Sequence, residues 1–83
     1  MDHISYTTRG VCSRRIEIDI DNNRIVAVQF QGGCAGNTQG VAALTVGMTV
    51  TEVIERLEGI RCGFKSTSCP DQLAKALREY QQS

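Results

Sequence analysis

Alternating apolar and polar residues predict a β-hairpin in the N-terminal half of the chain. Ile16, Ile18 and Ile20 alternate with acidic residues, which is the period of a half-buried strand. Residues 21–23, Asp-Asn-Asn, are typical of a tight turn because Asn tolerates positive φ. A second alternating run follows, so we expect an antiparallel hairpin with this inward face: Ile16, Ile18, Ile20, Val26, Val28 and Phe30.

A polar, β-prone stretch from His3 to Thr8 precedes the hairpin and has Ile4 and Tyr6 on one face. We expect it to form an edge strand, which completes a three-stranded antiparallel sheet. Helical spacing of apolar residues then predicts three helices after the sheet, at about 37–46, 49–58 and 70–81. The predicted fold class is α+β, a single domain over residues 1–83 with the three helices packed on one face of the sheet.

The first two helices carry recognisable capping residues. Asn37 suits the N-cap of the first helix, which would bury Val41 and Leu44 and end at Gly47. Residues 49–52, Thr-Val-Thr-Glu, are a full capping box, which predicts the start of the second helix.

The third helix is predicted to begin at a cysteine. Ser68 and Asp71 have the spacing of a capping box, and Pro70 fits the first turn, where its missing N–H costs nothing. Cys69 is therefore expected within one residue of a helix N-terminus. Backbone N–H groups and the helix dipole favour an anion there, and a thiolate is the form of cysteine that binds metals or attacks disulfides.

The composition argues against several classes of function. A chain of 83 residues has one small core and often needs a metal, a disulfide or a second subunit for stability. Nine basic and nine acidic residues cancel and form no basic run, so neither a nucleic acid nor a membrane surface is expected as a partner. No apolar stretch approaches the roughly 20 residues that a membrane span needs.

The N-terminal residues, Met-Asp-His-Ile, lack the basic and apolar regions of a signal peptide. We therefore expect a cytoplasmic protein, in which thiols stay reduced. Four cysteines in that compartment favour metal or redox chemistry over structural disulfides.

All four cysteines lie in breaks between the predicted elements. Cys12 precedes the second strand, Cys34 follows the third strand, and Cys62 and Cys69 bracket the loop before the last helix. The start of one hairpin strand lies beside the end of the other, so the hairpin brings Cys12 and Cys34 to one end of the sheet. Cys69 joins them if the last helix docks with its N-terminus at that end.

Other interpretations of these residues stay open. Free cysteines are among the most buried residues, and Cys62, between Ile60 and Phe64, best fits a small core residue. His3, the single histidine, is expected on the surface rather than as a metal ligand. The basic residues that flank cysteines are either solvated charges or charges that offset a thiolate cluster: Arg14, Arg15, Arg61 and Lys65.

Residues 67–71 spell the name of the TSCPD domain family, which the chain resembles from about Tyr6 to Tyr80. Residues 32–37, 47–50 and 62–63 also look like its standalone members. The family occurs as an accessory domain at the C-terminus of some ribonucleotide reductases, chiefly adenosylcobalamin-dependent ones, and small members are often labelled ribonucleoside-diphosphate reductase.

The resemblance implies an accessory or thiol-redox role beside a larger reductase, in which Cys62 and Cys69 are candidates for a reversible disulfide. Reductase activity in this chain alone is not expected. Ribonucleotide reduction requires a radical-generating barrel of several hundred residues, which an 83-residue chain does not supply.

The order of elements also resembles iron–sulfur cluster scaffolds of the NifU/IscU type, whose cluster ligands would fall on Cys12, Cys34 and Cys69. Two scaffold positions differ, because Arg14 stands in place of an Asp and Ser68 in place of a His. That Asp is associated with a labile, transferable cluster, so the resemblance implies a more permanent site with Cys62 as a fourth thiolate. Four thiolates suit zinc and an iron–sulfur cluster equally.

Three functions are therefore in competition. The first is a metal-binding module, the second an accessory or redox component of ribonucleotide reduction, and the third an interaction domain whose cysteines only pack. We favour the first, with a zinc ion or an iron–sulfur cluster as cofactor. A ribonucleotide reductase or another protein is a candidate partner, an oligomer stays open, and the expected metal ligands are Cys12, Cys34, Cys62 and Cys69.

Overall fold

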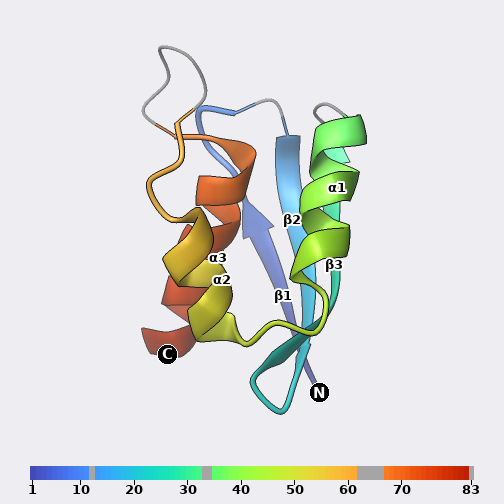
Figure 1. The fold of residues 1–83 in the computed structure, drawn as a ribbon. Helices are drawn as coiled ribbons and strands as arrows, with labels where there is room; N and C mark the ends of the chain where they lie inside the picture. The colour runs from blue at the N-terminus through green and yellow to red at the C-terminus, as the bar shows by residue number, and fades with distance from the viewer. Residues whose placement is uncertain (12, 33–34, 62–66, 83) are drawn as a thin grey trace.

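The computed structural model describes residues 1–11, 13–32, 35–61 and 67–82 (Figure 1). It confirms the expected α+β fold, a three-stranded antiparallel sheet followed by three helices. The elements in chain order are β1 (Asp2–Thr7), β2 (Ser13–Asp21), β3 (Arg24–Gly32), α1 (Ala35–Thr45), α2 (Val50–Leu57) and α3 (Cys69–Gln82).

The sheet has the order β1-β2-β3, and each strand pairs with its neighbour in the chain. Ile18 of β2 lies opposite Ile4 of β1 and Val28 of β3, which sets one apolar row across the sheet. Ile16 forms a second row with Tyr6 and Phe30 in the same way. Both isoleucines are fully buried, so this face of the sheet packs against the core.

The hairpin departs from strict alternation at its turn. Asn22 and Asn23 both have positive φ, at 56° and 65°, as a tight two-residue turn requires. A register shift between Asp19 and Ile20 then pairs Ile20 with Ile25. As a result Ile25 is 2% exposed and Val26 is 42% exposed, so the expectation that Val26 faces inward is wrong. The cause is the bulge, since one extra residue in a strand reverses the faces of the alternating pattern.

Helix α1 is rotated relative to the expected orientation. Thr38 and Thr45 are buried, whereas Leu44 is 79% exposed, so the expectation that Leu44 enters the core is wrong. The inward stripe runs through positions 38, 41 and 45, which recur at helical spacing, and Leu44 lies outside it. The helix also begins at Ala35 rather than at the expected N-cap, Asn37.

The connection between α1 and α2 is tied to the hairpin. Gly47 has a φ of 90°, and its N–H donates to the carbonyl of Ile25 at 2.8 Å. Thr49 then caps α2 through the full capping box with Glu52 that the sequence predicts. Because residue 25 is held by this connection, α2 starts at a set position over the sheet.

The core lies between the sheet and the helices. Val50, Val53 and Ile54 of α2 and Leu73 and Leu77 of α3 join the strand isoleucines in one buried cluster. Within the described ranges, no helix combines the length and the apolar character that crossing a bilayer requires.

The opposite face of the sheet is polar and carries His3. Its Nδ1 lies 2.7 Å from Asp19 Oδ1, and its Nε2 lies 3.3 Å from Glu17 Oε1. Ser5 donates to the other oxygen of Glu17 at 2.5 Å. These contacts explain His3 as a surface residue that pairs across strands β1 and β2.

We expect the bulge to decide which of two neighbouring residues stabilises the fold. Ile25→Ala removes a buried side chain and should lower the free energy of unfolding by about 2 to 5 kcal/mol. Val26→Ala removes a half-exposed one and should cost less than about 1 kcal/mol. Urea unfolding of both variants measures the difference, and a larger loss in Val26→Ala would contradict the register.

Hydrogen bonds to Asp19 and Glu17 raise the pKa of His3 above its ordinary value of 6.5. The charged imidazole therefore stabilises the fold below the unfolded pKa, and this contribution is lost as pH rises through the folded pKa. Titration of the His3 ring protons by NMR should give a midpoint above 6.5 that falls in Asp19→Asn. Asp21→Asn is the matched control and should leave the midpoint in place. A wild-type midpoint at or below 6.5 would contradict the pairing.

Candidate functional site

Of the four expected metal ligands, the structure describes Cys69. It is the first residue of α3 and is half-buried, in agreement with the predicted position at a helix N-terminus. Cys12, Cys34 and Cys62 lie outside the described residues, so the expected convergence of the thiols stays a prediction. Among the residues that are described, no group of three or more His, Cys, Asp or Glu side chains is arranged to hold a metal ion.

Ser68 is the N-cap of α3. Its Oγ accepts a hydrogen bond from the backbone N–H of Asp71 at 3.1 Å, which is one half of a capping box. The same hydroxyl donates to the carbonyl of Ile60 at 2.7 Å. The cap therefore also fastens the start of α3 to the end of the segment that follows α2.

The carboxylate of Asp71 does not complete the capping box but bridges to other segments. Oδ1 accepts the backbone N–H of Gly59 at 2.7 Å, and Oδ2 accepts the hydroxyl of Thr67. Lys75, one turn further along α3, places its ammonium 3.3 Å from Oδ2. Asp71 is only 3% exposed, so these donors replace the water that a buried carboxylate loses.

The pKa of Asp71 reflects this balance. Burial acts to raise it, but the hydrogen bonds from Thr67 and Gly59, with Lys75 nearby, outweigh burial and hold the pKa below its ordinary value. The carboxylate is therefore ionised at neutral pH and accepts all three contacts as an anion.

Gln72 connects α3 to the loop between β1 and β2. Its Oε1 accepts the backbone N–H of Arg9 at 3.0 Å, and its Nε2 donates to Thr67 Oγ1 at 3.1 Å. Gly10, with a φ of 72°, follows Arg9 and runs close to the Thr67 side chain. We call Thr67, Ser68, Asp71 and Gln72 the α3 cap network, because together they hold the β1–β2 loop and the segment after α2 against the start of α3.

Sequence reasoning identified Ser68 and Asp71 as capping residues but did not predict the hydrogen bonds of the network to distant segments. A usable signal was present, because Gln72 lies four residues before Ala76 and so extends the inward stripe of α3. A polar side chain at an inward position must find a hydrogen-bonding partner. The sequence does not say that the partner is the N–H of Arg9, which is 63 positions away.

The sheet brings the ends of two strands to the end of the molecule at which α3 begins. Ser13, at the start of β2, pairs with Gly32, at the end of β3. Arg15 pairs with Gln31, so Arg14 is the extra residue of a bulge, and its carbonyl accepts the N–H of Thr8. Figure 1 shows the start of β2, the start of α1 and the start of α3 at one end of the fold.

The described residues next to the four cysteines therefore belong to segments that start at this end or are hydrogen-bonded to the start of α3. Val11 and Ser13 flank position 12, Gly32 and Ala35 flank positions 33–34, and Arg61 and Thr67 flank positions 62–66. The flanking basic residues that the structure describes, Arg14, Arg15 and Arg61, are exposed, and Lys65 lies outside the described residues. Both interpretations of these charges therefore stay open.

Asp71→Asn should test the α3 cap network. An amide keeps the shape but loses the charge, so we expect the free energy of unfolding at pH 7 to fall by about 2 kcal/mol. Because the folded pKa of Asp71 is depressed, its contribution is present above the unfolded pKa of about 4 and is lost as pH falls through the folded pKa. The difference in the free energy of unfolding between wild type and variant should therefore become smaller as pH falls to about one unit below the unfolded pKa.

Urea unfolding at several pH values measures both effects. Glu55→Gln, at an exposed carboxylate of α2, is the matched control and should change stability by less than about 0.5 kcal/mol. A similar loss in both variants, or a difference that does not become smaller in acid, would contradict the assigned role of Asp71.

Comparison with known proteins finds the family whose name is spelled by residues at the start of α3. The TSCPD domain family matches residues 1–81 of the chain. No curated protein sequence and no solved structure gives a significant match. Within the matched span, the letters that name the family are Thr67 to Asp71, which contribute the N-cap, the half-buried thiol and the buried carboxylate at the start of α3. The chain belongs to the TSCPD domain family.

Proposed function

We propose that the chain is a small metal-binding module. Cys12, Cys34 and Cys69, with Cys62 as a fourth thiolate, would hold one zinc ion or one iron–sulfur cluster. The observation that supports the proposal is that β2, α1 and α3 all begin at one end of the fold, so segments next to the cysteines lie at that end. The hydrogen bonds of Gln72 to Arg9 and of Ser68 to Ile60 keep two of these segments against the helix.

The donor set fits either group. Four thiolates are the ligands of closed structural zinc sites and of common iron–sulfur clusters. Cys69 at the N-terminus of α3 lies where backbone N–H groups and the helix dipole favour negative charge. A zinc ion would supply folding free energy, and a cluster would supply either that or electron transfer.

The α3 cap network serves this role by positioning rather than by ligation. Asp71 accepts hydrogen bonds from Gly59 and Thr67 and faces Lys75, so its oxygens are already engaged. Gln72 and Ser68 are likewise engaged with neighbouring segments. Their shared effect is to keep the first turn of α3 in place, so that a thiolate at Cys69 meets its co-ligands at low conformational cost.

Anaerobic purification followed by elemental analysis and an optical spectrum tests the proposal. We expect about one zinc ion, or one iron–sulfur cluster, per chain. Substitution of Cys12, Cys34 or Cys69 by Ser should in each case abolish binding, because each variant lacks one of the proposed thiolate ligands. Cys62→Ser decides whether the fourth thiolate is required.

His3→Ala is the matched control, because it removes a potential ligand on the opposite face of the sheet and should leave metal content unchanged. A folded protein that contains no metal and takes up neither zinc nor iron would overturn the proposal. Metal that survives each of the single cysteine substitutions would overturn the assigned ligands. A reversible Cys62–Cys69 disulfide in metal-free protein would instead support the redox role.

A further inference from the structure

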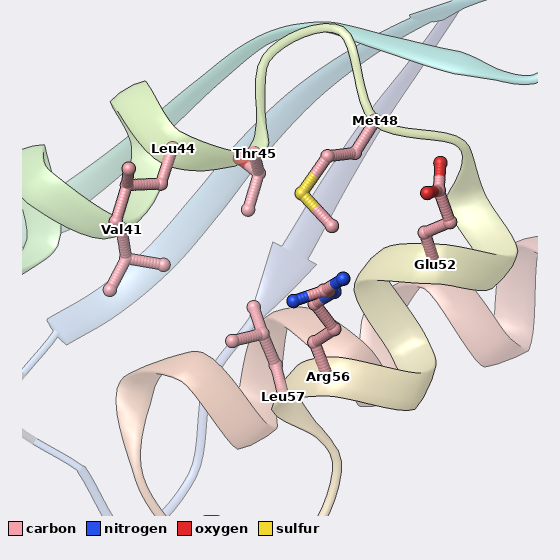
Figure 2. A pocket seen from close by; sticks show the side chains of 7 residues that line it. All are labelled: Val41, Leu44, Thr45, Met48, Glu52, Arg56 and Leu57. Carbon is pink, nitrogen blue, oxygen red and sulfur yellow. The ribbon is translucent and has the colours of Figure 1, made fainter.

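An apolar groove lies between α1 and α2, away from the start of α3 (Figure 2). Its volume is about 360 Å³, and Val41, Leu44, Met48 and Leu57 supply its apolar lining. Leu44 is 79% exposed, although Val41 on the same helix is half-buried. A solvent-exposed leucine at the edge of an apolar groove extends the apolar surface, and such a surface is suited to contact with another molecule.

Two opposite charges lie on the groove side of α2. Glu52 and Arg56 are one helical turn apart, and Figure 2 shows both side chains reaching from α2 toward the segment that carries Met48. One oxygen of Glu52 accepts the N–H of Thr49 at 2.9 Å, and this hydrogen bond holds the pKa of Glu52 below its ordinary value. The positive charge of Arg56 attracts Glu52 within the same chain and adds to this lowering of the pKa. In the part of the chain that the structure describes, the Arg56 guanidinium forms no hydrogen bond or close ion pair.

We propose that this groove is the contact surface of a homodimer with two-fold symmetry. The α2 helices of the two copies lie antiparallel across the axis, and Leu44 of each copy enters the groove of the other. A two-fold contact uses the same patch twice, so the patch must hold both a projection and a recess. Leu44 and the recess lined by Met48 and Leu57 meet that requirement.

The order of charges favours a second copy as the occupant. Antiparallel α2 helices bring Glu52 of one copy opposite Arg56 of the other, and the symmetry repeats this pair. A partner of uniform charge would oppose one of the two residues. The formal net charge of the chain is zero at pH 7, so two copies approach without overall repulsion.

The dimer is independent of the proposed metal site. Leu44 lies near the C-terminal end of α1, whereas the cysteine-flanking residue Ala35 begins the helix. Among the described residues, none that lines the groove is a cysteine. Loss of the dimer and loss of the metal are therefore separate outcomes.

Sedimentation equilibrium over protein concentrations of about 1 to 500 μM tests the proposal. We expect the wild type to reach twice the 9.1 kDa mass of the chain at the upper end of the range. Leu44→Glu should weaken the dimer by about 100-fold or more in Kd, because it buries a charge in an apolar groove. Ala43→Glu, at an exposed neighbour outside the groove lining, is the matched control and should remain dimeric.

Charge reversal supplies a second test that does not touch the apolar lining. Arg56→Glu sets two carboxylates opposite each other at both contacts and should dissociate the dimer. The double variant Glu52→Lys/Arg56→Glu restores opposite charges and should recover it, while circular dichroism follows any loss of the α2 cap. A wild type that is monomeric at every concentration would overturn the proposal. So would a dimer that survives Leu44→Glu and Arg56→Glu, or one that Ala43→Glu breaks equally.

Discussion

The buried carboxylate of Asp71 is the constraint on which the arrangement of the helices depends. An ionised group with 3% exposure is costly unless charged or hydrogen-bonding partners surround it. Here the partners come from the end of α2, from the residue before the α3 cap and from the next turn of α3. Satisfying one carboxylate therefore fixes the start of α3 against the end of α2, although the linker between them passes through positions 62–66.

The same network gives the family motif a physical meaning. Its threonine and aspartate form a hydrogen-bonded pair, and its serine caps the helix. The cysteine between them occupies the first position of α3, where it is half-buried. Three residues of the motif thus support one thiol. This distribution of roles is typical of sites in which a rigid surrounding shell orients a reactive or ligating group.

The surfaces of the fold divide into regions with different chemistry. The open face of the sheet is polar, and His3 with Glu17 and Asp19 links its strands. The end of the molecule that holds the start of α3 collects the segments next to the cysteines. The groove between α1 and α2 is apolar with one charge of each sign on its rim. The rotation of α1 separates the last two regions, because it turns Leu44 away from the core.

Short-range patterns in the sequence determined the order of the elements and the caps of α2 and α3. The isoleucine alternation, the Asn-Asn turn, the Thr49 capping box and Ser68 at the start of α3 all act within a few residues, so each can be read without the rest of the chain. The hairpin pattern also predicts that Cys12 and Cys34 meet at one end of the sheet, whereas Cys62 as a fourth ligand rests on the resemblance to the cluster scaffolds. All three cysteines lie outside the described residues. Only the tertiary structure decided that Ile25 rather than Val26 faces inward, that Leu44 is exposed, and that Gln72 reaches Arg9. Those outcomes depend on a bulge, on the rotation of a helix and on a hydrogen bond between distant segments, and packing of the whole chain sets all three.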